Sequence, residues 1–129
     1  MLNGPMSLTT AQAAAQTGLT VHTLRYYERD GLLLRDVDRS ATGHRRYTDD
    51  DIAWIVLLTR LRATGMPIRE VSRYAELVRA GTGNEQERLD LLQSHRQNVL
   101  AQLAEVTEHL GAIDRKIGIY ADRIENHLT

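Results

Sequence analysis

Apolar residues recur along the last third of the chain in alternating steps of three and four residues. The series starts at Leu89, reaches Ile124 and is broken only by Arg96. A 3.5-residue period held for about five heptads is typical of a coiled coil, because a helix lying on a globular core drifts toward a period of 3.6. We therefore expect a long helix that forms a homodimer. The predicted dimerisation residues are Leu92, Val99, Leu103, Val106, Leu110, Ile113, Ile117 and Tyr120.

The region before this helix has a different organisation. The segment "GTGN" at residues 81–84 is the evident linker. It predicts a domain at 1–80, followed by the dimerisation helix and a short tail at 81–129. The rival interpretation is a long amphipathic helix packed on its own domain. The preceding region looks too small to cover about 50 Å of such a helix.

The composition excludes several classes of site. The chain has no cysteine, which excludes disulfides, thiol nucleophiles and thiol-based redox sensing. Alanine and leucine outnumber β-branched residues, which favours helices. The amino-terminal segment "MLNGPMSLTT" lacks the basic and apolar regions of a signal peptide, and no apolar run is long enough to span a bilayer. We expect a cytoplasmic protein with no membrane segment.

Two short helices are predicted close together near the amino terminus. Thr9 and Gln12 have the spacing of a capping box, and Thr20 is a second capping residue. The predicted helices are 11–16 and 21–29, ended by Gly18 and Gly31. A pair of short helices joined by a tight turn is the pattern of a helix-turn-helix.

Two brief strands around a loop, a wing, are expected in the segment that follows Gly31. Thr48 and Asp51 then cap a third helix, whose apolar stripe runs to Gly65. Pro67 suits the first turn of a fourth helix, which ends at Gly81. Its predicted inward residues are Ile68, Val71, Ala75 and Val78.

The basic residues of the wing suggest a contact with phosphate. The net charge is only −1, but the segment from Arg39 to Tyr47 contains three arginines, His44 and no acid. Such a segment in a neutral protein is typical of a nucleic-acid contact, although a solvated loop is the plain alternative.

The second helix has one face suited to a DNA groove. At 100° per residue from the inward Leu24, Tyr27 lies about 60° away, at the edge of the core. The outward residues are Arg25 at about 100°, Arg29 at about 140°, His22 at about 160° and Tyr26 at about 200°. Arginine reaches phosphates and guanine edges, while tyrosine and histidine donate to phosphate oxygens. This face therefore predicts DNA binding.

Four features follow one another from about Leu8 to Ile124: "TLRYYERDGLL", "RRYTDDDI", a Gly-Met-Pro-Ile turn and the terminal heptads. In this combination the chain resembles the MerR family of bacterial transcription regulators. It implies a mainly α fold with a winged helix-turn-helix, a second helix pair and an antiparallel coiled coil. It also implies a homodimer that binds palindromic promoter DNA and distorts it, with RNA polymerase as a further partner.

Candidate DNA contacts combine the residue patterns with this resemblance. Arg25, Tyr26 and Tyr27 would contact the groove and phosphates by family likeness, while the segment "RRY" at 45–47 would supply wing contacts. The full predicted set is Thr10, Thr20, His22, Arg25, Tyr26, Tyr27, Arg29, Arg39, His44, Arg45, Arg46 and Tyr47.

Other functions have little support in the sequence. No metal site, cofactor or catalytic residue is predicted, because the histidines are scattered and no phosphate-cradling glycine loop occurs. The chain lacks the cysteines that metal-sensing and thiol-sensing relatives use. Arg60 aligns with the position of the cysteine in the thiol-sensing relatives. An effector pocket near Trp54, Tyr74 or Tyr120 is one hypothesis for these aromatic residues. Packing in the core is the alternative. A protein-binding coiled-coil module is the rival function.

Overall fold

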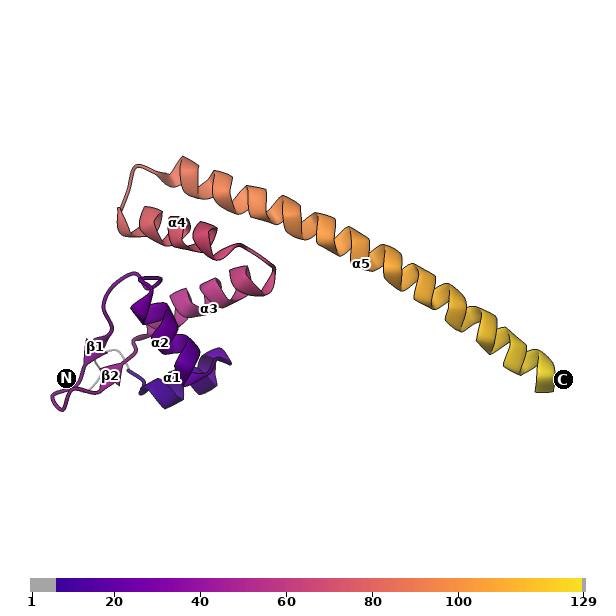
Figure 1. The fold of residues 1–129 in the computed structure, drawn as a ribbon, viewed down its shortest axis with the longest axis horizontal. Helices are drawn as coiled ribbons and strands as arrows, with labels where there is room; N and C mark the ends of the chain where they lie inside the picture. Colours follow the sequence, from indigo (N-terminus) through magenta and orange to yellow (C-terminus); the bar gives the residue numbers. More distant parts are fainter. Residues whose placement is uncertain (1–6, 129) are drawn as a thin grey trace. The chain divides into compact units, whose positions relative to one another are not determined.

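The computed structural model describes residues 7–128, which form five helices and one small hairpin (Figure 1). The mainly α fold, with a winged helix-turn-helix and a long carboxy-terminal helix, is confirmed. The elements are α1 (Thr10–Thr17), α2 (Val21–Arg29), β1 (Asp38–Arg39), β2 (Arg45–Arg46), α3 (Asp49–Ala63), α4 (Ile68–Arg79) and α5 (Glu85–Leu128).

The chain divides into two compact units, and the division falls inside α5. The first unit extends to Leu91, and the second begins at Leu92. The first turns of α5 therefore belong to the unit that contains α1 to α4. The functional boundary predicted between residues 80 and 81 stays a prediction.

Local side-chain caps begin the first three helices. The Thr9 hydroxyl accepts from Gln12 N at 3.1 Å, while Thr9 N donates to the Gln12 side chain at 2.9 Å. Thr48 forms the same reciprocal arrangement with Asp51, at 3.2 and 2.9 Å. Thr20 accepts from Thr23 N at 3.0 Å. All three predicted caps are confirmed, and each satisfies amide groups that a helix start leaves unpaired.

The core of the first unit lies among α1, α3, α4 and the inward face of α2. Contacts join α1 to α2, α1 to α3, and α3 to α4. Its largest fully buried side chains are Leu24, Leu32, Tyr47, Ile55, Leu58, Met66 and Val71. These side chains come from α2, α3, α4 and the segments that connect the elements, so their burial holds α2 against the other helices.

The inward residues predicted for α4 need correction. Val71 and Ala75 are buried as expected, but Ile68 in the first turn is 37% exposed. Leu77, which the apolar stripe omitted, is only 5% exposed. Leu77 lies about 120° around the helix from Val71. The helix therefore buries side chains on more than one face, which a single stripe does not reveal.

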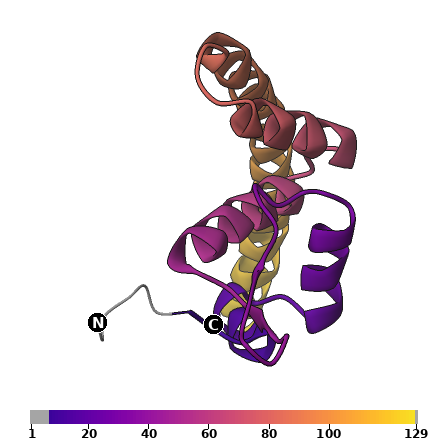
Figure 2. The same ribbon diagram turned by 90° about the vertical axis from the view of Figure 1, so that its left-hand side faces the viewer.

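The wing is a two-stranded antiparallel hairpin beside the α1–α2 pair (Figure 1, Figure 2). Its register pairs Asp38 with Arg46 and Arg39 with Arg45. Gly43 adopts a φ of 85° at the tip, a conformation that suits glycine in a tight turn. The hairpin predicted around this glycine is confirmed.

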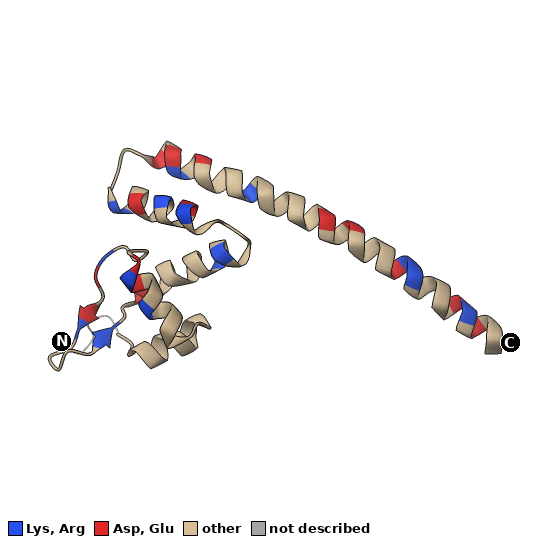
Figure 3. Ribbon diagram, viewed as in Figure 1, with Lys and Arg blue, Asp and Glu red and all other residues tan. Residues whose placement is uncertain are grey.

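The heptad segment lies entirely within α5, a continuous helix of 44 residues. Acidic and basic residues are interspersed along it, whereas α1 carries neither kind (Figure 3). No helix within residues 7–128 combines the length and apolar character that crossing a bilayer requires.

Candidate nucleic-acid interface

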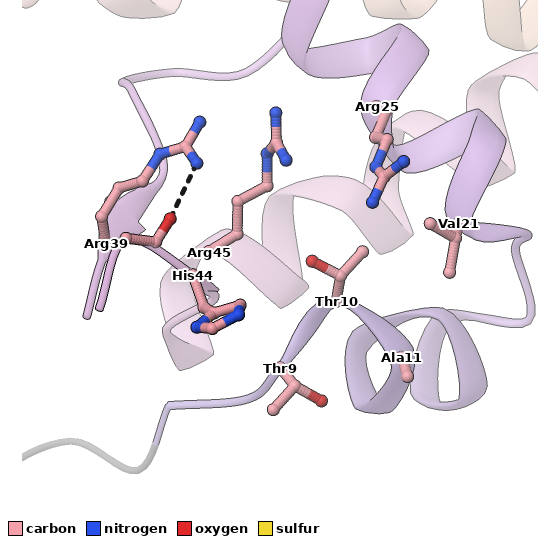
Figure 4. Close-up of a pocket in the computed structure, with 9 residues that line it drawn as sticks. Thr9, Thr10, Ala11, Val21, Arg25, Arg39, His44 and Arg45 are labelled. Atoms are coloured by element: carbon pink, nitrogen blue, oxygen red, sulfur yellow. Dashed lines mark hydrogen bonds between the residues drawn. The ribbon is translucent and has the colours of Figure 1, made fainter. Parts of the chain in front are cut away.

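A basic hollow opens between the start of α1, the face of α2 and the wing (Figure 4). It encloses about 400 Å³. We call this surface the basic hollow; its lining residues are Thr9, Thr10, Ala11, Val21, Arg25, Arg39, Gly43, His44 and Arg45. Three arginines and a histidine thus meet around one concave surface, with no acidic residue in the lining.

The outward face of α2 is exposed as the helical angles predict. Arg25, Arg29 and His22 are exposed and Tyr26 is half-buried, whereas Tyr27 is only 6% exposed. The Arg29 guanidinium lies 5.6 Å from the centre of the Tyr26 ring, a cation–π arrangement. Tyr27 therefore belongs to the core and offers little surface to a ligand.

Arg25 differs from the other arginines of the hollow. Its guanidinium forms no hydrogen bond or ion pair with any of the described residues, and it projects from α2 on the side of the hollow that holds Thr10 (Figure 4). All five of its N–H donors therefore remain available for a phosphate or a base edge.

The wing arginines are instead held by acceptors within the protein. Arg39 donates to Gly43 O at 3.0 Å, and Arg46 donates to Ser7 O at 2.7 Å. Arg45 Nε lies 2.5 Å from Glu28 Oε1 on α2, and both side chains are partly buried. These bonds fix the side chains before any ligand arrives, which lowers the entropy lost on binding.

Sequence reasoning missed Glu28 as a partner of the wing. It noted Glu28 only as an acid near the flank of the α2 face, and 17 positions separate it from Arg45. Because the pairing depends on how the wing packs against α2, no periodic pattern marks it. Its bond uses Arg45 Nε, and the terminal nitrogens of Arg45 form no hydrogen bond within residues 7–128.

Tyr47 requires the main correction to the predicted contacts. Its side chain is 0% exposed, so in this conformation it belongs to the core and cannot touch DNA. Two backbone bonds of 2.8 Å pair Tyr47 with Leu8 and fix this strand at the wing's base. No hydrogen bond of good geometry reaches the phenol hydroxyl within residues 7–128, although the Thr10 side chain lies close to it. Burial raises the pKa of the Tyr47 phenol, the charge of Glu28 raises it further, and the Thr10 side chain partly offsets these effects.

The Tyr47→Phe variant should therefore bind DNA as well as the wild type. Removing a buried, unpaired hydroxyl should leave stability unchanged or increase it by up to about 1 kcal/mol. Thermal unfolding and duplex titration measure the two effects. Tyr47→Ala is the control for packing, with an expected loss of about 3 to 5 kcal/mol as for other buried aromatics. A tenfold loss of DNA affinity in Tyr47→Phe would contradict this expectation and show that the Tyr47 hydroxyl contacts DNA.

The remaining predicted contacts have mixed surroundings. Thr20 is exposed, but its hydroxyl caps α2. Thr10 is half-buried in the basic hollow, and His44 Nδ1 lies 2.9 Å from Thr42 Oγ1 at the wing tip. No group of three or more histidine, aspartate or glutamate side chains in residues 7–128 is arranged to hold a metal ion.

Trp54 and Tyr74, suggested as pocket residues, pack against each other. Their rings are stacked at 5.6 Å, and Trp54 Nε1 donates to Leu32 O at 2.8 Å. Trp54 is 8% exposed. This arrangement supports core packing, the alternative given for both residues.

The winged helix-turn-helix and the helix pair after it match a known family. Residues 8–77 match the model of the MerR HTH family regulatory protein. The chain belongs to the MerR family. An HTH-type transcriptional regulator of Haemophilus influenzae is 39% identical over 89% of this chain and 84% of its own length. AdhR of Bacillus subtilis, another HTH-type transcriptional regulator, is 39% identical over 70% of this chain, which covers 64% of that protein.

Solved structures of MerR regulators share the fold. HiNmlR, a MerR family regulator lacking the sensor domain and bound to promoter DNA, matches with a TM-score of 0.77 and 40% identity. That match covers 82% of this chain and 80% of HiNmlR. A MerR family protein from Listeria monocytogenes matches with a TM-score of 0.81 and 31% identity, over 88% and 86% of the two chains. The chain is thus a MerR-type transcriptional regulator, of a family of DNA-binding regulators rather than enzymes.

Proposed function

We propose that this MerR regulator binds a palindromic promoter site as a homodimer, with α2 in the major groove and the wing on the flanking backbone. The observation that carries the proposal is the basic hollow, where Arg25, without a hydrogen-bond partner among residues 7–128, shares one concave surface with wing arginines already held in place. The 40% identity with HiNmlR, a MerR family regulator bound to promoter DNA, supports promoter DNA as the ligand. We place the protein in the cytoplasm, together with its promoter.

The dimer in this proposal forms through α5. The predicted seam residues Leu103, Val106, Leu110, Ile113, Ile117 and Tyr120 are 52–61% exposed in the single chain. An apolar stripe of this length is stabilised when a second helix covers it, and its 3.5-residue period suits a left-handed coiled coil. We propose that the two α5 helices pair antiparallel, which places one DNA-binding unit at each end of the coiled coil.

Control of transcription would follow from DNA shape. Bending a short site costs of order 1 to 6 kcal/mol, and contacts to phosphates on both sides must supply that energy. Arg39, Arg45 and Arg46 on the wing are the proposed source of the flanking contacts. The distorted promoter would then be the form that RNA polymerase meets.

The salt dependence of DNA binding tests the proposal. We expect a steep linear fall of log affinity with log salt, because each neutralised phosphate releases a counterion. Replacing Arg45 with alanine should reduce that slope by about 1. Arg115→Ala, which removes an exposed arginine on the outer side of α5, is the matched control and should keep the wild-type slope. A flat slope for the wild type would instead favour the protein-binding module.

A further inference from the structure

Three consecutive backbone carbonyls just after α2 accept hydrogen bonds from side chains of α3 and α4. Arg79 Nη1 on α4 donates to Gly31 O at 2.7 Å and to Leu33 O at 2.9 Å. Trp54 Nε1 on α3 donates to the intervening Leu32 O at 2.8 Å. We call this arrangement the carbonyl clamp: residues 31–33 held by Arg79 and Trp54.

Residues 31–33, which the clamp holds, are also hydrogen-bonded to the end of α2. Leu32 N donates to Tyr27 O at 3.0 Å, and Gly31 N donates to Glu28 O at 3.2 Å. Gly31 has a φ of 71°, which reverses the chain directly after the helix. Leu32 and Leu33 are buried at 2% and 8% exposure. A displacement of residues 31–33 therefore also displaces α2, because no flexible loop separates the two.

The middle and the carboxy-terminal part of α4 are also tied to the start of α5 within the same unit. Asn84 Nδ2 in the linker donates to Leu77 O at 2.8 Å. Arg73 Nη2 on α4 lies 2.9 Å from Glu87 Oε2 in the first turn of α5. Arg79, the last residue of α4, joins the same helix to the segment that follows α2. The bonded path thus runs from the base of the dimerisation helix, through α4, to the end of the groove-facing helix.

We propose that Arg79 is a positioning residue that fixes the angle of α2 relative to the base of α5, and so sets the half-site spacing that the dimer accepts. This inference rests on the proposed function and deepens it. Half-site spacing is a geometric property of a two-fold DNA reader, since each half of the dimer must meet its groove in register. Arginine suits the task because the guanidinium is planar, so the two N–H groups of Arg79 Nη1 point at Gly31 O and Leu33 O at fixed angles.

The clamp contributes geometry more than fold stability. Arg79 is exposed, so water can satisfy Gly31 O and Leu33 O when the guanidinium is removed. The apolar burial of Leu32 and Leu33 remains in that case. Arg79→Met, which keeps most of the side-chain length without the donors, should therefore fold while its α2 pivots more freely.

Selection from a random-sequence duplex library tests this role and does not require a defined operator. The full-length wild type should enrich inverted repeats with a narrow distribution of spacer lengths. Arg79→Met should enrich the same half-sites with a broader distribution, and its preference for the wild-type spacer over one a base pair longer should fall at least about fivefold. Arg69→Met is the matched control, since it removes the same charge from an exposed site on α4 that takes no part in the ties to α2 or α5.

The outcomes separate the two levels of the proposal. If the wild type enriches no inverted repeat, the proposed function fails and this inference fails with it. If Arg79→Met merely binds more weakly, with the spacer distribution of Arg69→Met, DNA binding stands but the positioning role is overturned. Arg79→Lys keeps the charge with a single donor group and should show intermediate broadening, so it serves as the test if Arg79→Met unfolds. Emission from Trp54, the only tryptophan, reports whether each variant keeps the packing at the clamp.

Discussion

Replacing Arg25 with alanine should lower the affinity for operator DNA by about 5- to 150-fold, the cost of about 1 to 3 kcal/mol for a lost bidentate contact. Arg25 is exposed on α2, lines the basic hollow, and has no hydrogen-bond partner within residues 7–128. Its loss therefore removes a contact to DNA without breaking a bond inside the protein. Titration of a labelled operator duplex at fixed salt measures the affinity.

The control variant must keep the fold and must lose the same positive charge as Arg25→Ala. Arg115→Ala removes one exposed arginine from α5, far along the sequence from the hollow, and should bind within about twofold of the wild type, as surface substitutions usually have small effects. Sedimentation should show the same oligomeric state for both variants and the wild type. Unchanged binding by Arg25→Ala would show that another surface faces DNA.

Local features of the fold were predictable because their causes lie close together in the sequence. Each cap joins residues three apart, as Thr9 with Gln12 and Thr48 with Asp51. The α2 face likewise follows from helical geometry, which places Leu24 inward and Arg25 outward. Such interactions depend little on the remaining chain.

Features that depend on packing were not predictable in the same way. The Arg45–Glu28 bond spans 17 positions, and the Arg79–Gly31 bond spans 48. Neither leaves a periodic trace in the sequence. Tyr47 shows the converse error: its place in a basic "RRY" segment suggested a surface contact, but pairing with Leu8 at the base of the wing accompanies its complete burial. The charge pattern thus indicated the surface that forms the basic hollow, whereas tertiary packing decided which side chains line it.

Replacing Leu110 and Ile113 with glutamate should convert the dimer into monomers that bind half-sites poorly. These side chains are 53% and 57% exposed in the single chain, so covering each would contribute about 1 kcal/mol. Four such side chains per dimer give about 4 kcal/mol, or roughly a thousandfold in the dimerisation constant. Glutamates in the seam add a cost for desolvating their charges, which makes this a lower bound.

Sedimentation at several protein concentrations measures the dimerisation constant, and titration of an inverted-repeat duplex measures the effect on DNA binding. The matched control is Ala101→Glu with Ala104→Glu, which adds the same charges at the same spacing on the exposed outer side of α5. This variant should remain a dimer because neither position belongs to the seam. Since each DNA-binding unit of the Leu110/Ile113 variant stays folded, its half-site affinity should equal that of a wild-type unit acting alone. A persisting dimer would refute the heptad seam as the interface, while monomers with full operator affinity would refute the need for two linked readers.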